Sequence, residues 1–291
     1  MDFYITDVFG QEKYSGNQLA TFLYCGDLSD REMQQIAREI NFSETTFVVS
    51  DQPRDGGYDV RIFTPAAEID FAGHPTLGTA FVIQRYLIGQ AVEQVVLHLR
   101  IGPVSVRFPT TSDDTLLWMR QAEPTFGSQL ERTVLAQVLS LEGNDLDARW
   151  PIEQVSTGLP HIIAPLKDLA TLKRARIVRE RYDALVQRTW AKAILVFSPQ
   201  SYSTTHDLSV RMFADYYGVP EDPATGSGNG CLAAYLVKHR YFGEATIKVR
   251  VGQGFEIGRP SILALQAAEE QKGISVNVGG QVIPIAKGQW L

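Results

Sequence analysis

The chain has 291 residues and a mass of 32.3 kDa, about twice the commonest domain size, so two domains are the first expectation. Hydrophobic residues make up 44% and charged residues 21% of the sequence, which excludes a disordered chain. The net charge of −6 and the pI near 5.4 exclude the basic surface that nucleic acids and acidic membranes attract. The composition predicts an ordinary globular protein with no nucleic-acid or membrane partner.

Three features of the sequence concern the cellular compartment. The two cysteines, Cys25 and Cys231, are too few for a disulfide framework, and we expect both to be free thiols in a reducing compartment. The first ten residues, MDFYITDVFG, carry two aspartates and have no basic region before an apolar stretch, so we expect no signal peptide. The longest uncharged stretch, residues 223–237, is rich in glycine and too short to span a bilayer. The sequence therefore predicts a cytoplasmic protein.

Strands are predicted where β-branched and aromatic residues alternate with polar ones. These segments are 4–9, 45–50, 58–63, 95–100, 104–108, 193–197, 208–213 and 247–251. A helix is predicted over 29–40, because Ser29 and Glu32 have capping-box spacing and isoleucines recur at helical spacing. Apolar segments at 74–87 and 229–242 predict two more helices, each just after a glycine-containing turn. The predicted class is α+β with mixed sheets.

One pattern occurs twice along the chain. The motif Arg-x-Phe at 61–63 and again at 211–213 precedes a turn, a helix of small residues, and a strand ending in Arg-apolar-Gly, at 100–102 and 250–252. Arginine and final glycine are 41 positions apart in both copies (102 − 61 and 252 − 211), and the copies are offset by 150 (211 − 61). The glycine turns are offset by 153 (226 − 73), which a short insertion explains. We interpret the pattern as a duplicated half-domain.

A duplication of this kind predicts where a ligand binds. Two similar halves that face each other enclose a cleft, and such interfaces are preferred ligand sites. Each half would direct the N-terminus of its small-residue helix at the cleft, where unpaired backbone N–H groups and the positive end of the helix dipole suit a carboxylate. Gly73 and Gly226 at these helix starts allow close approach of the backbone to the ligand.

Four residues near these turns could carry chemistry: Glu44, His74, Asp222 and Ser227. Each also has an ordinary structural interpretation, as a solvated loop charge, a hydrogen-bonding histidine at a helix start, a turn or capping residue, and a helix cap. Their placement together argues for function, since His74, Asp222 and Ser227 lie on the turns that the repeat directs at one cleft, within reach of Glu44. Residues that other kinds of catalytic or binding site require do not occur at the spacing those sites need.

The remaining motifs exclude several classes of enzyme. The five histidines and two cysteines have no metal-ligand spacing. The segment GSGNG at 226–230 lacks the Lys-Ser/Thr of a P-loop and the final glycine of G-x-G-x-x-G, and Ser227 does not sit in a G-x-S-x-G elbow. The sequence therefore calls for no nucleotide, no metal, no acyl-enzyme and no other cofactor.

Several motifs together resemble the PhzF-like phenazine-biosynthesis isomerase family. They stand in family order and are SGNQLA (15–20), FSETTFV (42–48), RIFTPAAEIDFAGHPTLGTA (61–80), EDPATGSGNG (221–230) and QGFEIGRPS (253–261). The resemblance implies the diaminopimelate-epimerase-like fold, with two pseudo-symmetric half-domains, each a mixed β-sheet or barrel around a central helix. It implies an N-terminal half-domain at 1–122 to which a last strand at about 276–291 returns, a C-terminal half-domain at 123–275, an active site between them, and a homodimer.

The resemblance also assigns roles. In the phenazine enzyme the glutamate of the motif that corresponds to FSETTFV, here Glu44, is the general acid/base. It moves a proton from C3 to C1 of trans-2,3-dihydro-3-hydroxyanthranilate. His74 and Asp222 would line the site and hold or relay protons. A carboxylate-bearing small-molecule substrate would contact Gly73, Ser227, Gly226 and Asn17. The base should be desolvated, which raises the pKa of a carboxyl group towards neutrality, and no cofactor is required.

The sequence departs from related families at two positions. Amino-acid epimerases of this fold use two opposed cysteines, whereas Gly73-His74 and Gly226-Ser227 stand here at the matching places, and Cys231 one turn further on is interpreted as a packing residue. Asn229 adds a polar group near the site, so the substrate stays open. Two alternatives remain: an epimerase of an amino-acid derivative with Glu44 and Asp222 as opposed bases, and a catalytically silent binding protein on the same scaffold.

Overall fold

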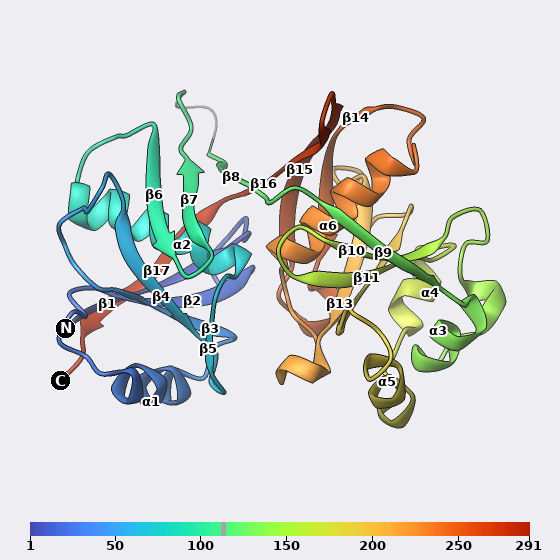
Figure 1. The fold of residues 1–291 in the computed structure, drawn as a ribbon, viewed down its shortest axis with the longest axis horizontal. Helices are drawn as coiled ribbons and strands as arrows, with labels where there is room; N and C mark the ends of the chain where they lie inside the picture. Colours follow the sequence, from blue (N-terminus) through green and yellow to red (C-terminus); the bar gives the residue numbers. More distant parts are fainter. Residues whose placement is uncertain (112–114) are drawn as a thin grey trace. The chain divides into compact units, whose positions relative to one another are not determined.

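The computed structural model describes residues 1–111 and 115–291. The chain forms two compact units (Figure 1). Unit 1 consists of Met1–Arg120 together with Gly279–Leu291, and unit 2 consists of Gln121–Val278. Within the described residues, every helix is too short or too polar to cross a membrane.

Unit 1 is built on one mixed sheet. Its strands are β1 (Asp2–Val8), β2 (Asn17–Phe22), β3 (Glu44–Val48), β4 (Tyr58–Phe63), β5 (Glu68–Ile69), β6 (Gln94–Leu99), β7 (Gly102–Arg107), β8 (Leu117–Arg120) and β17 (Val282–Gln289). The main strands pair in the order β17-β1-β2-β3-β4-β6-β7. These pairings are, in turn, antiparallel, antiparallel, parallel, antiparallel, parallel and antiparallel.

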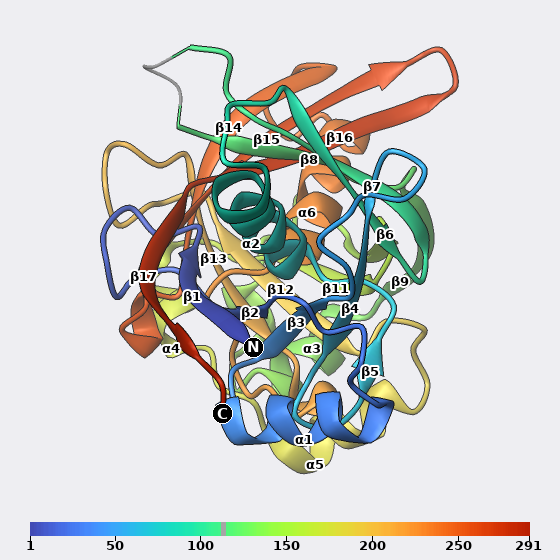
Figure 2. The same cartoon turned by 90° about the vertical axis from the view of Figure 1, so that its left-hand side faces the viewer.

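Helix α2 (Gly73–Val82) is the centre of unit 1 and continues into a π-helical turn, η1 (Ile83–Ile88). It packs against strands from both ends of the sheet, including β1, β2, β3, β6 and β7, and Figure 2 shows it end-on inside the curved sheet. All but one of its residues are buried, which explains its lack of a polar face. A chain of hydroxyl groups ties it to the sheet, from Thr79 to Thr46 at 2.7 Å and from Thr46 to Thr21 at 2.9 Å.

Helix α1 (Asp30–Ile40) lies on the other side of the unit 1 sheet (Figure 2). The expected capping box is present, because Ser29 accepts from the Glu32 backbone while the Glu32 side chain accepts from the Ser29 backbone. Met33 and Ile36 on its apolar face pack against aromatic rings of β2, β3 and β4. Unit 1 therefore has three layers, with α2 inside the sheet and α1 outside it.

Unit 2 repeats this plan. Its strands are β9 (Thr125–Leu130), β10 (Ile152–Ser156), β11 (Pro160–Pro165), β12 (Ala193–Ser198), β13 (Leu208–Phe213), β14 (Thr246–Gln253), β15 (Ser261–Glu270) and β16 (Gly273–Gly280), which leads back to unit 1. Its helices are α3 (Arg132–Val138), α4 (Leu169–Arg174), α5 (Arg179–Val186) and the central α6 (Gly226–Lys238), with short turns η2 (Gly143–Asp145), η3 (Asp215–Tyr217) and η4 (Phe255–Ile257). Helix α6 packs against β10, β11, β14 and β15 and is buried on all sides.

The two units have the same strand pairing, strand for strand. The order β9-β10-β11-β12-β13-β14-β15 is again antiparallel, antiparallel, parallel, antiparallel, parallel and antiparallel. In each of the parallel pairs β4–β6 and β13–β14, one central helix connects the two strands, as in a βαβ unit. This agreement confirms the predicted α+β fold of two pseudo-symmetric halves.

All eight predicted strands and all three predicted helices are present, with differences at their ends. The third predicted helix begins at Gly226 rather than 229 and ends at Lys238, because Arg240 adopts a left-handed backbone (φ 51°). The short insertion between the copies lies in the loop between β13 and α6, which contains η3.

The matched Arg-apolar-Gly ends, by contrast, are not structurally equivalent. Tyr58 pairs with Leu97 in unit 1 and Leu208 pairs with Val251 in unit 2, so these second strands are offset by 154 (251 − 97). Residues 250–252 lie within β14, whereas β6 has ended before 100–102. The equal spacing of 41 residues between arginine and glycine is therefore a coincidence, although the duplication of the half-domain itself is genuine.

Candidate functional site

Glu44 is the first residue of β3, directly after the turn that ends α1. Asn41 ends that helix in a left-handed conformation (φ 57°), which asparagine tolerates better than most residues, and the chain then reverses into β3. Parallel pairing of Glu44 with Leu19 fixes its backbone at the end of β3 that lies near the start of α2. Its side chain is 16% exposed, so the carboxyl group is mostly removed from water while still accessible.

His74 is the second residue of α2 and lies against Glu44. Its Nε2 is 3.3 Å from Glu44 Oε2, and its Nδ1 is 3.2 Å from the side-chain nitrogen of Asn17. Complete burial lowers the pKa of His74 to about 3, opposed by a backbone hydrogen bond with Gln18. The imidazole is therefore neutral at neutral pH, and its contact with Glu44 is not an ion pair.

A neutral imidazole carries one proton on one of its two nitrogens. When the Asn17 amide donates to Nδ1, the proton is on Nε2, the ring nitrogen that lies 3.3 Å from Glu44 Oε2. When the proton is on Nδ1, Nε2 can accept a proton from a protonated Glu44. The arrangement Asn17–His74–Glu44 can thus support either protonation state of the glutamate, which is what a group that takes and returns a proton requires.

The starts of the two central helices have no side-chain cap. Ala72 and Thr225 stand at the N-cap positions of α2 and α6, and neither side chain bonds to the first turn. Gly73 and Gly226 are the first helical residues and both are buried. The positive end of each helix dipole, with no acidic residue in the first turn, favours a bound carboxylate.

In unit 2, Asp222 lies on the loop that leads into α6 and is buried. Thr225 donates its hydroxyl hydrogen to Asp222 Oδ2. Gln253 Nε2 donates to the Asp222 carbonyl at 2.8 Å and to Thr225 Oγ1 at 3.0 Å. These bonds fix the backbone and one carboxylate oxygen of Asp222, so its side chain is held in a defined direction.

Asn229 belongs to the same network as Asp222. Its Nδ2 donates to Gln253 Oε1 at 2.8 Å and to the Thr225 carbonyl at 3.0 Å. The sequence singled out Asn229 but not Thr225 or Gln253. Gln253 stands at the start of the QGFEIGRPS motif, which was the available signal, but its partners come from a loop more than twenty residues earlier in the chain.

Ser227 is the second residue of α6 and is almost completely buried. Its carbonyl accepts a hydrogen bond from Thr157 at 3.5 Å. Cys231, one turn further along the helix, lies 3.7 Å from both Thr157 Oγ1 and His161 Nδ1. Burial raises the pKa of the Cys231 thiol to about 12, so it stays protonated, as a packing residue would.

The candidates fall into two groups, one in each unit. Unit 1 brings together Asn17, Glu44, Gly73 and His74, and unit 2 brings together Asp222, Gly226 and Ser227. Across residues 1–111 and 115–291, no three His, Cys, Asp or Glu side chains gather as metal ligands would.

The two groups are not chemical copies of each other. Thr45 pairs with Phe63 in unit 1, and Ile194 pairs with Phe213 in unit 2. Because the two phenylalanines are equivalent residues of the repeated Arg-x-Phe motif, Thr45 matches Ile194. The residue before each, Glu44 in unit 1 and Ala193 in unit 2, is therefore also equivalent. The helix starts align His74 with Ser227 at the offset of 153 (227 − 74). At these matching positions the fold carries a carboxylate and an imidazole in unit 1, and an alanine and a serine in unit 2.

This fold of two matching units, each built around one central helix, is also found in solved structures of other proteins. The fold alone is shared with a probable proline racemase from Agrobacterium radiobacter, at a TM-score of 0.62 and 10% identity over 100% of this chain and 92% of that one. A PhzF-family phenazine biosynthesis protein from Bacillus anthracis is much more similar, with a TM-score of 0.91 and 26% identity over 100% of this chain and 99% of that one.

The family follows from the sequence. The profile of phenazine biosynthesis-like proteins, PhzC-PhzF, matches residues 6–288. The trans-2,3-dihydro-3-hydroxyanthranilate isomerase of Pseudomonas aeruginosa is 34% identical over 291 residues, which cover 98% of this chain and 97% of that enzyme. The chain belongs to the PhzC-PhzF family and is an enzyme of its isomerase type, which confirms the resemblance seen in the motifs.

Proposed function

We propose that this enzyme moves a proton between two carbons of a small carboxylate-bearing substrate, without a cofactor, as a relative of trans-2,3-dihydro-3-hydroxyanthranilate isomerase. Glu44 is the general acid/base. The observation that carries the proposal is the contact of a mostly buried carboxyl group with a buried, neutral imidazole, His74 Nε2 to Glu44 Oε2 at 3.3 Å.

The proposed reaction uses this contact directly. Glu44 removes a proton from a carbon next to an unsaturated system, and the electron pair left behind delocalises towards the substrate carboxylate. An uncapped helix start, at Gly73 or at Gly226, stabilises that carboxylate and its growing charge. Protonated Glu44 then returns the proton to the other carbon, so that the double bond moves and no net proton is consumed. A positioned acid/base of this kind contributes about 10² to 10⁴-fold in rate.

Asp222 and Ser227 complete the proposal. We assign Asp222 to the amino or hydroxyl group of the substrate, since Thr225 and Gln253 already hold its carboxylate and backbone in one orientation. Ser227 and Asn17 are assigned to substrate binding and to support of His74, respectively. We also propose that the enzyme is a homodimer, which sedimentation equilibrium would test.

An epimerase with two opposed bases is the less favoured alternative. Such a mechanism needs a base on each face of the stereocentre, and the positions in unit 2 that match Glu44 and His74 are Ala193, which has no base, and Ser227. A single acid/base that moves a double bond fits this asymmetry better.

The test is proton NMR of trans-2,3-dihydro-3-hydroxyanthranilate in deuterated buffer, with wild type, Glu44→Gln, and Glu39→Gln as an exposed control on α1. We expect the wild type and Glu39→Gln to move the double bond and incorporate deuterium. Glu44→Gln should be slower by about 10² to 10⁴-fold, because the amide cannot take the proton. Chelator should leave the wild-type rate unchanged.

Each other outcome contradicts a stated part of the proposal. Equal rates in wild type and Glu44→Gln would remove Glu44 as the base. Deuterium incorporation with inversion at one carbon would establish the epimerase instead. Binding of the substrate without any exchange would favour the binding protein. Full dependence on added metal would contradict the cofactor-free mechanism.

A further inference from the structure

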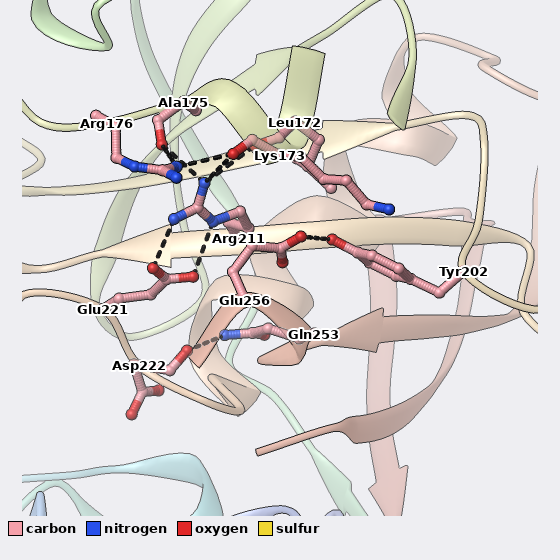
Figure 3. Close-up of polar contacts among 10 residues, drawn as sticks. All are labelled: Leu172, Lys173, Ala175, Arg176, Tyr202, Arg211, Glu221, Asp222, Gln253 and Glu256. Atoms are coloured by element: carbon pink, nitrogen blue, oxygen red, sulfur yellow. Dashed lines mark hydrogen bonds and ion pairs between the residues drawn. The ribbon is translucent and has the colours of Figure 1, made fainter. Parts of the chain in front are cut away.

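The side chain of Arg211 on β13 is buried, and its guanidinium group is saturated with hydrogen bonds (Figure 3). Nε and Nη2 donate to the two carboxylate oxygens of Glu221 at 2.9 and 2.7 Å. Nη1 donates to the carbonyls of Leu172 and Ala175, at the end of α4, at 3.0 and 2.7 Å. Arg211 therefore joins three parts of unit 2: the strand β13, the end of α4, and the loop that precedes α6.

Asp222 directly follows Glu221, the partner of Arg211. Figure 3 shows the Glu221 carboxylate facing Arg211 while the Asp222 carboxylate points away from it. The Asp222 backbone N–H donates to the Met212 carbonyl at 3.0 Å, and its carbonyl accepts from Gln253. Arg211 thus holds Glu221 directly before Asp222, and the Asp222 backbone is held by Met212 and Gln253.

Unit 1 contains the same device. Arg61 on β4 donates from Nε and Nη2 to the two oxygens of Glu68 at 2.8 and 2.7 Å, and from Nη1 to Asp30 at the start of α1. Each arginine also lies over the phenylalanine two residues further along its own strand, at 5.2 Å in unit 1 and 4.9 Å in unit 2. The repeated Arg-x-Phe motif is thus the sequence signature of one construction used twice.

The spacing shows which part of this construction is fixed. Arginine and glutamate are 7 positions apart in unit 1 (68 − 61) and 10 apart in unit 2 (221 − 211). From the glutamate to the first residue of the central helix the distance is 5 in both units (73 − 68 and 226 − 221). The insertion falls before the glutamate, and the segment between glutamate and helix keeps its length.

We propose that Arg211, acting through Glu221, is a positioning residue for Asp222 and the first turn of α6. Arg61 acts in the same way, through Glu68, on the start of α2 and His74. This inference rests on the proposed function in that Asp222 and His74 are taken to serve proton transfer. Since a misplacement of 1 Å can cost about 10²-fold in rate, loosening either pair should reduce turnover far more than substrate binding.

The chain offers a matched control for the unit 2 pair. Glu153 on β10 is also a buried glutamate in an ion pair, bound by Lys238 at 2.6 Å and His239 at 2.8 Å. Those partners lie at the C-terminal end of α6, whereas Glu221 precedes its N-terminal end. Glu221→Gln and Glu153→Gln therefore remove the same charge from similar surroundings at opposite ends of one helix.

The test compares these two variants by urea unfolding, by kinetics, and by carbon-13 NMR of the Asp222 carboxyl group, assigned with Asp222→Asn. We expect both variants to lose stability. Glu221→Gln should lower kcat by about 10- to 100-fold with KM changed by less than about threefold, and should shift the Asp222 resonance. Glu153→Gln should change neither kcat nor that resonance.

Equal losses of kcat in both variants would overturn the positioning role and leave only a contribution to stability. Arg211→Lys keeps the positive charge but loses the bidentate contact with Glu221. It is the variant to test if Glu221→Gln does not fold. An unmoved Asp222 resonance in Arg211→Lys would also overturn the proposal. The Asp222 resonance can be measured without turnover. If the wild type is inactive on the test substrate, that result contradicts the proposed function, and the shift of the resonance still tests the positioning role of Arg211.

Discussion

His161 is a fully buried imidazole on β11, beside the central helix of unit 2. Its Nδ1 lies 2.9 Å from the Leu159 carbonyl, which makes Nδ1 the donor, and Gly228 on α6 leaves room for the other edge of the ring. Burial lowers its pKa from 6.5 to about 4. His161 and His74 are therefore both neutral in the folded enzyme over a pH range in which they are charged in the unfolded chain.

This difference predicts sensitivity to acid. Between about pH 6.5 and pH 4 the unfolded chain binds a proton at His161 that the folded enzyme does not, so stability falls as the pH falls. The full effect of one such group is about 3 kcal/mol. We expect His161→Asn, which keeps a donor for Leu159, to be less stable at pH 7 but to lose less stability on acidification. Urea unfolding at several pH values measures this, and an unchanged slope would contradict it.

The candidate site shows how far single residues can be predicted from sequence. Glu44, His74 and Asp222 are candidates because each stands in a sequence motif at the start of β3, at the start of α2 or on the loop before α6. Gln253 and Arg211 were not assigned roles, although both belong to quoted motifs. Their partners are backbone and side-chain groups from other elements, and no local spacing encodes those contacts.

At the scale of single elements, α2 depends on a close approach to its sheet. A Cβ atom on Gly78 would lie 2.5 Å from Leu19 Cδ2 and 2.9 Å from Val8 Cγ2. These contacts are far inside ordinary van der Waals distances. The glycine therefore serves packing of the helix against β1 and β2, at the expense of helix propensity.

Gly78→Ala separates these two effects. Alanine improves helix propensity by about 1 kcal/mol, whereas overpacking of a core costs about 1 to 3 kcal/mol, so we expect a net loss of stability. Gly143→Ala in η2 is the control, since its Cβ would meet only Thr133 Cγ2 at 3.8 Å. Thermal unfolding of both variants decides the matter, and a more stable Gly78→Ala would show that α2 can move away from its strands.

The elements that the sequence did not predict share a physical cause. β10 reads IEQVS and is buried throughout, but its Glu153 is buried only because Lys238 and His239 bind it. β2 and β11 lack a clean alternation, since both of their faces are covered. Helices α3, α4 and α5 have only 6 to 8 residues, too few for a clear period. These elements have no clear periodic signal, whereas the equally buried β12 and β13 are predicted from their β-branched and aromatic residues.

At the scale of the whole molecule, unit 1 is discontinuous in sequence. Strand β17 pairs with β1 along its whole length, from Asp2 opposite Gln289 to Val8 opposite Val282. Without β17 one edge of β1 would present unpaired backbone groups. Unit 2, in contrast, is one continuous stretch, Gln121–Val278.

This topology predicts different behaviour for two fragments of unit 1. Residues 1–120 alone should not fold cooperatively, whereas 1–120 joined by a short flexible linker to 279–291 should, because the linked chain restores the β1–β17 pairing. Circular dichroism and urea unfolding of the two chains measure this. Cooperative folding of residues 1–120 alone would contradict the importance of β17.

The pairing of β1 with β17 also has a consequence for synthesis on the ribosome. The strand that completes unit 1 emerges only after the 158 residues of unit 2 (278 − 120). At about 5 to 20 residues per second, β1 waits roughly 8 to 30 s with one edge open. During that interval a nascent chain can pair through β1 with another nascent chain, so co-translational chaperones and translation speed over residues 121–278 bear directly on the yield of correctly folded enzyme.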